Sequence, residues 1–181
     1  MREFNTDTFF LKDKDFDVYL RPINDSDSAC IIKWRNSLSV KKYFIYQDDL
    51  TLESQKKWIR TKVASGEVIQ FMIINIFDDQ PIGSIYLRNI DYKNNKAEFG
   101  IFIGDVSQRG KGFGVQATKL LIRYAFLEKK LHRIYLRVFS DNLNAISSYK
   151  KIGFKYEGES IDDVFVNGKY RNLTWMSIIK R

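Results

Sequence analysis

The sequence predicts a mixed α/β fold in a single domain. The 181 residues are 44% hydrophobic and 29% charged, which is a globular composition, and a domain of this length buries about 70% of its extended surface. Prolines occur only at positions 22 and 81, and no Gly/Ser-rich stretch divides the chain. Segments with strand and helix periodicity alternate along it. We therefore expect one domain over residues 1–181, with residues 1–15 as a loosely ordered N-terminal extension.

The first half of the chain is expected to contain four strands and two helices. Thr51 suits the capping position of a helix, and Glu53 places a negative charge in the first turn, where the helix dipole favours it. The turn from Asp78 to Pro81 separates two apolar strands. The expected elements are a strand at 18–22, a helix from Asp25 or Ser26 to Trp34, a helix at 52–63, and strands at 70–77, 82–90 and 96–103.

The second half is expected to add two helices and three strands. Phe113, Ala117 and Leu121 recur with helical spacing and give one helix an apolar face. Asn142 is a favourable N-cap for the next helix, and Gly153 is a left-handed stop. The expected elements are helices at 112–128 and 142–152 and strands at 133–139, 155–161 and 170–179, with a hairpin turn at 167–168.

The charge is distributed unevenly along the chain. The formal net charge is +8, and residues 91–181 carry 17 Lys and Arg against 9 Asp and Glu, whereas the two types balance in residues 1–90. The excess indicates a polyanionic ligand, either a phosphorylated cofactor or nucleic acid, or else a solvated basic surface.

Cysteine and histidine are too few for several kinds of chemistry. Cys30 is the only cysteine and His132 the only histidine, so an internal disulfide and a Cys/His zinc cluster are excluded. No metal is expected. No apolar run reaches the ~18 residues that span a bilayer, and the N-terminus lacks the pattern of a secretory signal. We expect a cytoplasmic protein that does not engage a membrane.

Three glycines, Gly110, Gly112 and Gly114, lie between a predicted strand and a predicted helix. Backbone without side chains can approach an anion there, while the first N–H groups and the dipole of the helix point at it. A Walker A loop would need Ser or Thr after Lys111, and a dinucleotide fingerprint would need glycine at Val115, so ATP and NAD are disfavoured. The loop predicts a phosphate site; a tight connection without a ligand is the alternative.

Two segments resemble the acetyl-CoA signature of the GNAT (Gcn5-related N-acetyltransferase) superfamily. One is Arg109-x-x-Gly112-x-Gly114, which follows the strand 97–103. The other runs from Asp141 to Phe154 and reads Asp-Asn-x-x-Ala-Ile-x-x-Tyr-Lys-Lys-x-Gly-Phe. The two motifs together are far more specific than either alone, and the resemblance covers the chain from Val18 to its C-terminus.

This resemblance implies a mixed, mostly antiparallel sheet that is flanked by helices and splays open at the cofactor site, between the strands 96–103 and 133–139. Acetyl-CoA would thread the gap, with its pantetheine arm against strand backbone and its pyrophosphate in the glycine loop. Asn142 also fits a plain helix cap, which would account for it by itself. The implied acetyl-CoA contacts are Ile101, Phe102, Ile103, Arg109, Gly110, Lys111, Gly112, Phe113, Gly114 and Asn142.

Two side chains are candidates for the acid–base chemistry. Acetyl transfer to an amine needs a deprotonated amine, a stabilised oxyanion and a proton for the departing thiolate. Tyr149 matches the family's general-acid tyrosine, since a phenol keeps its proton at neutral pH; packing alone is the alternative. Glu98 interrupts an apolar strand that leads to the gap and is the candidate base. Its ordinary pKa is far below that of an amine, so it would need burial or a relay to act as one. The alternative is a strand residue that faces solvent.

The first helices are expected to select the acceptor amine. Trp34-Arg35-Asn36 resembles acetyltransferases that modify amino sugars on nucleotides, and Arg35 could bind a phosphate while Trp34 stacks on a base or sugar. A buried Trp34 and a solvated Arg35 are the alternative. We expect a small-molecule amine such as an amino-sugar nucleotide as the substrate.

Other acceptors and other classes of protein stay open. The C-terminal half resembles spermidine acetyltransferases, and a protein N-terminus is a third acceptor. A polyamine would be repelled by a +8 protein unless acidic side chains such as Asp48, Asp49, Asp162 and Asp163 converge. A non-catalytic CoA-binding module is a different class, and a nucleic-acid-binding module is disfavoured because the basic residues are scattered. A second copy of the chain, in a homodimer, is the expected protein partner.

Overall fold

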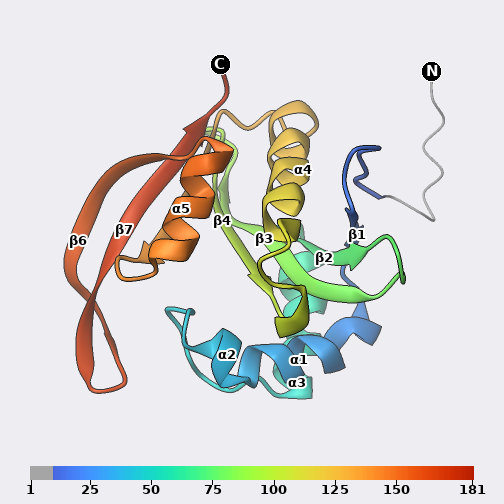
Figure 1. Cartoon of the computed structure of the whole chain (residues 1–181), viewed down its shortest axis with the longest axis horizontal. Coiled ribbons are helices and arrows are strands. Elements are labelled where there is room, and N and C mark those ends of the chain that lie inside the picture. Colours follow the sequence, from blue (N-terminus) through green and yellow to red (C-terminus); the bar gives the residue numbers. More distant parts are fainter. Residues whose placement is uncertain (1–9) are drawn as a thin grey trace.

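The computed structural model describes residues 10–181, which fold around one seven-stranded sheet (Figure 1). The strands lie in the order β1-β2-β3-β4-β5-β7-β6, and the β4–β5 pair is parallel in an otherwise antiparallel sheet. The strands are β1 (Val18–Pro22), β2 (Ile69–Asn75), β3 (Pro81–Asp91), β4 (Lys96–Ile103), β5 (Arg133–Phe139), β6 (Lys155–Val166) and β7 (Lys169–Ile179). The helices are α1 (Ser28–Asn36), α2 (Leu38–Lys41), α3 (Leu52–Trp58), α4 (Phe113–Leu127) and α5 (Leu143–Ile152). This architecture confirms the predicted fold class.

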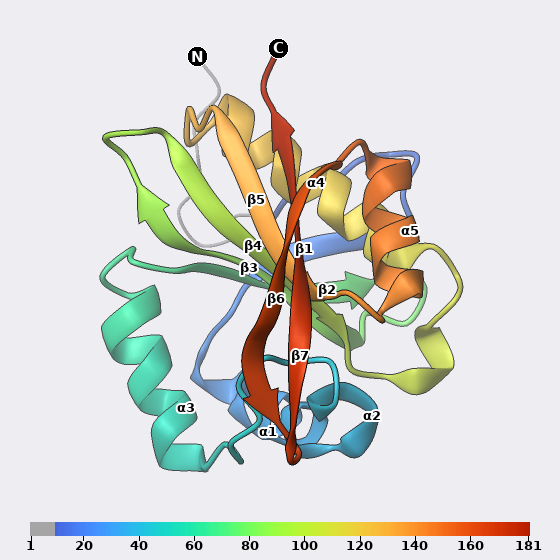
Figure 2. The ribbon, with the colours of Figure 1, turned by 90° about the vertical axis from the view of Figure 1, so that its left-hand side faces the viewer.

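Helices cover the sheet on both faces. α4 and α5 lie on one face and α1, α2 and α3 on the other, as Figures 1 and 2 show from two sides. α4 packs on the larger core, which includes Leu20, Phe71 and Leu136, whereas Met72 and Phe102 belong to a second core under α1 and α3. Because residues 70–75 of β2 and 82–85 of β3 are buried on both faces of the sheet, exposed and buried positions do not alternate there.

β4 and β5 pair at only one end. Lys96–Glu98 pairs in parallel with Arg133–Tyr135, after which β4 continues beside β3 to Ile103 and β5 continues beside β7 to Phe139. In Figure 1, β6 and β7 turn away from β3 and β4, and α5 lies between the two groups of strands in this view. The sheet therefore splays open between β4 and β5, as the sequence predicts.

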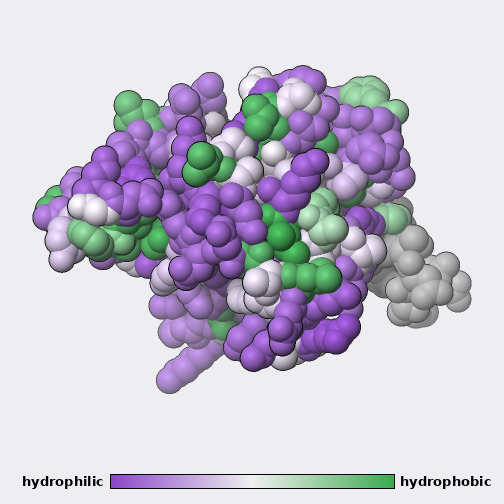
Figure 3. All heavy atoms as spheres, turned by 90° about the horizontal axis from the view of Figure 1, so that it is seen from below, coloured by the Kyte–Doolittle hydropathy of each residue, from purple (hydrophilic) through white to green (hydrophobic). Residues whose placement is uncertain are grey.

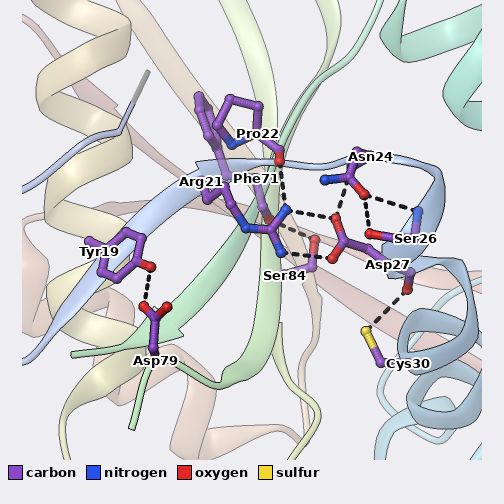
Figure 4. Close-up of polar contacts among 10 residues, drawn as sticks. All are labelled: Tyr19, Arg21, Pro22, Asn24, Ser26, Asp27, Cys30, Phe71, Asp79 and Ser84. Carbon is purple, nitrogen blue, oxygen red and sulfur yellow. Dashed lines mark hydrogen bonds and ion pairs between the residues drawn. The ribbon is translucent and has the colours of Figure 1, made fainter. Parts of the chain in front are cut away.

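Polar contacts fix the chain between β1 and α1 (Figure 4). Asn24 caps a 3-10 turn at Asp25–Asp27 by accepting a hydrogen bond from the Ser26 N–H at 2.9 Å. The Asp27 carboxylate accepts two hydrogen bonds from the Arg21 guanidinium, at 2.8 and 3.0 Å, which ties the start of α1 to β1. The prediction of a cap at residue 25 or 26 is wrong, because the chain makes this 3-10 turn first and the cap moves to Asn24.

Most other predicted elements agree with the structure. Thr51 and Asn142 cap α3 and α5 with their side chains, and Gly153 ends α5 with a φ of 114°. α2 was not predicted, because four residues are too few to reveal a helical period. Residues 59–63 continue α3 as a single π turn, and β6 extends beyond its predicted end to Val166 through two irregularities in its pairing with β7.

The predicted N-terminal extension falls mostly on residues 1–9, which lie outside the described residues. From residue 10 onward the chain belongs to the fold: Leu11 bridges to Leu20, and the ring edge of Phe10 packs on Tyr19 at 5.2 Å between centroids. Within residues 10–181, no helix is both long and apolar enough to cross a membrane. Figure 3 views the molecule from below, where the surface is mainly hydrophilic with hydrophobic groups gathered in patches.

Candidate active site

A large cavity of about 920 Å³ occupies the opening between β4 and β5. On the α4 and α5 side it is lined by the glycine loop that follows β4 and by one face of α5. Its middle is formed by β4 and β5 beyond their last paired residues, and its far side by α1, α3 and the loop between α2 and α3. The cavity therefore joins the two faces of the sheet through the gap.

The glycine loop presents unused backbone donors to the cavity. Gly110 and Gly112 have left-handed φ values of 78° and 84°, and no atom lies within 4 Å of where a Cβ would stand on either residue. α4 begins at Phe113, and the N–H groups of residues 110–114 donate to no acceptor in the described part of the chain. A helix start with open space and unused N–H groups fits a phosphate, so the pyrophosphate of acetyl-CoA is compatible with this loop.

Arg109 holds the glycine loop in place through its side chain. Its guanidinium donates to the Ile103 carbonyl through Nε and one terminal nitrogen, at 3.0 and 2.9 Å, and to the Ser39 carbonyl at 3.1 Å. Arg109 thus braces the glycine loop against the end of β4 and against α2. Three of its five side-chain N–H groups are used within the protein, and Arg109 also lines the cavity, so its role as a cofactor ligand stays a prediction.

The remaining predicted acetyl-CoA residues surround the same end of the cavity, with one exception. Lys111 does not line the cavity, and its ammonium donates to the half-buried Gln108 side chain at 3.0 Å. Asn142 lines the cavity and is also the N-cap of α5, because its side chain accepts a hydrogen bond from the Ala145 N–H at 3.3 Å. The structure brings together Ile101, Phe102, Ile103, Gly110, Gly112, Phe113, Gly114 and Asn142.

Tyr149 lies on α5 with its side chain in the cavity. Its ring packs edge-on against Phe99, at 5.9 Å between centroids, and against Phe154 at 5.8 Å. Burial, followed by the neighbouring Tyr86, raises the pKa of the Tyr149 hydroxyl above its ordinary value. The hydroxyl therefore keeps its proton throughout the neutral range and is available as a donor.

Tyr86 is a cavity residue that sequence reasoning missed. It stands opposite Gly100 in the β3–β4 pairing, and a Cβ on Gly100 would lie only 2.3 Å from the Tyr86 ring. The ring therefore occupies the space above the glycine at the start of the gap. A glycine inside an apolar strand signals such a close approach, and Gly100 is the feature from which this neighbour could have been anticipated.

Glu98 is buried at the last paired position of β4, with only 3% of its surface exposed. Its carboxylate accepts hydrogen bonds from Arg88 on β3 at 3.0 Å, from Asn89 at 2.8 Å and from Arg137 on β5 at 3.1 Å. Burial acts to raise the pKa of Glu98, but the two guanidiniums outweigh it and hold the pKa below its usual range. The solvent-facing alternative is corrected, because Glu98 is buried as an ion-pair centre that joins three strands. Its role as a base stays a prediction, which the lowered pKa disfavours.

The predicted acceptor residues Trp34, Arg35 and Asn36 separate in the structure. Trp34 packs in the second core against Phe102 and fills the space beside Gly104, outside the cavity lining. Asn36 exchanges two hydrogen bonds with the Leu50 backbone, at 2.8 and 2.9 Å, and also lies outside the lining. The predictions for Trp34 and Asn36 are wrong because both side chains hold the fold together; Arg35 alone reaches the cavity.

Cysteine and metal chemistry find no support in this site. The Cys30 thiol donates to the Asp27 carbonyl at 3.1 Å and does not line the cavity, and burial raises its pKa to about 11. Within the described residues, no three His, Cys, Asp or Glu side chains gather closely enough to hold a metal ion.

The arrangement suits an extended ligand with an anionic end, because phosphates can accept hydrogen bonds from the loop while the rest of the molecule passes through the gap. A CoA thioester has that form, and a protonated Tyr149 beside the gap can supply the proton that a departing thiolate needs. The fold and this chemistry define the class of acyl-CoA-dependent transferases.

Comparison with known proteins identifies the family within that class. The model of the acetyltransferase (GNAT) domain matches residues 17–155. A spermidine N(1)-acetyltransferase of Escherichia coli (strain K12) is 31% identical over 163 residues, which are 90% of this chain and 86% of that protein. A putative ribosomal N-acetyltransferase of Bacillus subtilis (strain 168) is 36% identical over 59% of this chain and 57% of its own length. The chain belongs to the GNAT acetyltransferase family.

Solved structures agree with this assignment. The spermidine N-acetyltransferase of Vibrio cholerae in complex with CoA and spermine superposes with a TM-score of 0.85 at 26% identity, over 90% of this chain and 95% of that one. A dodecameric structure of the same kind of enzyme superposes with a TM-score of 0.77 at 25% identity, over 90% and 94%. The protein is thus an N-acetyltransferase with acetyl-CoA as its co-substrate, as the sequence predicts.

Replacing Glu98 by glutamine should destabilise the fold, because two arginines lose their shared counter-ion. We expect Glu98→Gln to lower the free energy of unfolding at pH 7 by about 3 kcal/mol, measured by urea denaturation. The pKa of Glu98 is lower in the folded than in the unfolded chain, so the ion pairs contribute fully above the ordinary Glu pKa of about 4.3 and are lost as the pH falls through the depressed folded value. The difference between wild type and variant should therefore shrink on acidification.

Glu159→Gln, on the exposed face of β6, is the control and should change stability little. Equal losses in both variants would contradict the role of Glu98.

Proposed function

We propose that the protein acetylates the primary amine of a small molecule by direct transfer inside the gap between β4 and β5. The observation that carries this proposal is the continuity of the cavity from the glycine loop to the side of α1 and α3. The thioester and the amine can then approach the gap from opposite faces of the sheet, which places two reactants together without a covalent enzyme intermediate.

In this mechanism the chain binds, orients and supplies one proton. Acetyl-CoA supplies the acetyl group as a thioester, held at its phosphates by N–H groups of residues 110–114. The amine nitrogen attacks the carbonyl carbon, and the C–S bond breaks after the tetrahedral intermediate. The backbone edge of β4 that β5 leaves unpaired offers N–H donors to the oxyanion. Tyr149 gives its proton to the departing thiolate.

The proton of the ammonium has no obvious carboxylate acceptor in the cavity. Among the described residues that line it, Glu98 is the one acidic side chain, and its ion pairs stabilise the deprotonated carboxylate. A carboxylate with a lowered pKa is a poor proton acceptor at neutral pH. We infer that the amine loses its proton to solvent, so the rate should rise with pH toward the pKa of the free amine.

Similarity and sequence motif favour different acceptors. The names of the relatives support a polyamine, because spermidine N-acetyltransferases align over nine-tenths of this chain. The amino-sugar nucleotide that the Trp34–Asn36 segment predicts has no counterpart among the relatives described above, and a protein N-terminus has weaker support from the shorter match. The dodecameric neighbour supports self-association, and a cytoplasmic location stays a prediction.

A thiol-release assay tests the proposal directly. Purified protein is incubated with acetyl-CoA and one amine at a time, from a panel of polyamines, amino sugars with and without phosphate, and peptide amines, while free CoA is measured. We expect at least one small-molecule amine to raise thiol release well above the rate of acetyl-CoA hydrolysis. Stimulation by peptide amines alone would contradict a small-molecule acceptor.

Tyr149→Phe separates acid catalysis from packing. Phenylalanine keeps the contacts with Phe99 and Phe154 but lacks the proton, so we expect kcat to fall by about 10²-fold or more while the Kd for acetyl-CoA, measured by calorimetry, changes little. Tyr156→Phe, at an exposed position on β6, is the control and should retain kcat. An unchanged kcat in the Tyr149 variant would remove its acid role.

Gly112→Ala should weaken acetyl-CoA binding because its methyl group would stand in the space open to the phosphates. Gly66→Ala is a matched control, since Gly66 also has a positive φ of 78° and open space around it but lies outside the cavity. Both substitutions should destabilise the fold by about 1 kcal/mol through the left-handed backbone. Only the Gly112 variant should show a raised Kd for acetyl-CoA by calorimetry; equal Kd values for the two variants would count against the loop as the phosphate site.

A further inference from the structure

Several buried polar groups in the cavity lack partners within the protein. In the described residues, four buried side-chain nitrogen or oxygen atoms have no hydrogen-bond partner, and three of them are N–H donors that belong to cavity-lining side chains. These donors are Arg35 Nε, Gln55 Nε2 and Arg88 Nε. An unpartnered buried donor costs about 1–3 kcal/mol, so a group of them in one cavity indicates a ligand that accepts hydrogen bonds.

Arg35 is the strongest of the three indications. Its guanidinium lies flat on the Phe44 ring, 3.5 Å from the centroid, and its single hydrogen bond is a long one of 3.5 Å to the Tyr46 carbonyl. No carboxylate pairs with it, and burial lowers its pKa. A stacked guanidinium that lacks a counter-ion is held rigidly with its donors available.

Arg88 lines the same cavity as Arg35 and adds a second positive charge to it. One of its terminal nitrogens pairs with Glu98, but that carboxylate is shared with Arg137, so one negative charge serves two arginines and Arg35 is not paired with it. Over the whole lining of the cavity, five basic side chains accompany this one acidic group. Among the described residues, the charge of Arg35 has no carboxylate partner, and Arg35 lies on α1, across the gap from the glycine loop.

We infer that the acceptor amine carries an anionic group, a phosphate or a carboxylate, which Arg35 and Arg88 bind with help from Gln55. This inference rests on the proposed acetyl transfer and selects among its acceptors. A polyamine offers only cationic N–H donors and would be repelled by the arginines. The acidic residues that could offset it, Asp48, Asp49, Asp162 and Asp163, do not line the cavity. The chemistry of the cavity therefore favours an anion-bearing amine over the polyamines named for the relatives.

The kinetic test uses amines that differ in their anionic group. Glucosamine is the amine without an anionic group. Glucosamine 6-phosphate and UDP-glucosamine test the phosphate, and β-alanine tests the carboxylate. Spermidine is the polyamine of the panel. We expect the highest kcat/KM for an amine that bears an anionic group. Arg35→Gln should raise the KM for that amine by about tenfold or more and leave the KM for acetyl-CoA unchanged. Lys33→Gln removes the same charge from the exposed face of α1 and should leave both values unchanged. A higher kcat/KM for spermidine than for every anionic amine, with Arg35→Gln neutral, would overturn the inference.

A binding test keeps the anion site separate from the transfer reaction. The protein is first saturated with CoA, which occupies the glycine loop, and is then titrated with UDP or with glutarate in a calorimeter. We expect one of these anions to bind and Arg35→Gln to weaken that binding about tenfold or more, even if no tested amine is acetylated. Binding of neither anion would overturn the inference while leaving acetyl transfer intact.

Gln55→Met serves as a second variant that leaves the charge unchanged. It removes an unpartnered donor whose side chain is only 4% exposed, so the melting temperature of the free protein should not fall, whereas the KM for the anion-bearing amine should rise. A lowered melting temperature with an unchanged KM would assign Gln55 to the fold and contradict its part in the site.

Discussion

The functional architecture depends on the short parallel pairing between β4 and β5. Two strands that stay paired along their length would leave no path between the faces of the sheet. Here they are joined only through Lys96–Glu98 and Arg133–Tyr135, and each then follows a different antiparallel neighbour. Glu98 stands at the point of separation and binds arginines from both adjacent strands. Its buried ion pairs fix where the sheet divides, and therefore where the cavity lies.

The two sides of this gap recognise their ligands by different physical means. On the side of α4 the donors are backbone N–H groups, which glycine leaves accessible and which the helix dipole makes favourable for phosphate. On the side of α1 and α3 the donors that we propose are arginine and glutamine side chains. Backbone recognition tolerates changes of sequence as long as the glycines remain, whereas side-chain recognition changes with a single substitution. A family can thus keep its co-substrate while its members differ in acceptor.

This division explains how the chain can resemble spermidine acetyltransferases and still carry an acceptor side suited to anions. Identity of about a quarter to a third is enough to preserve the sheet, the gap and the loop. Such identity leaves most positions free to differ, including the few side chains that would face the acceptor. Arg35 and Arg88 come from a helix and a strand that are far apart in the sequence. Glu98 offsets too little of the positive charge for the cavity to favour binding of a polycation.

The sequence by itself determined the order of the elements, the co-substrate loop, the caps at Thr51 and Asn142, and the place of Tyr149 on its helix. Each of these is encoded by neighbouring residues, since capping, glycine φ and helical spacing are local properties. Only the tertiary structure decided the role of Glu98, whose partners lie 10 and 39 positions away, and separated Arg35 from Trp34 and Asn36. Burial and ion pairing are set by packing between distant segments, and local patterns carry little information about them.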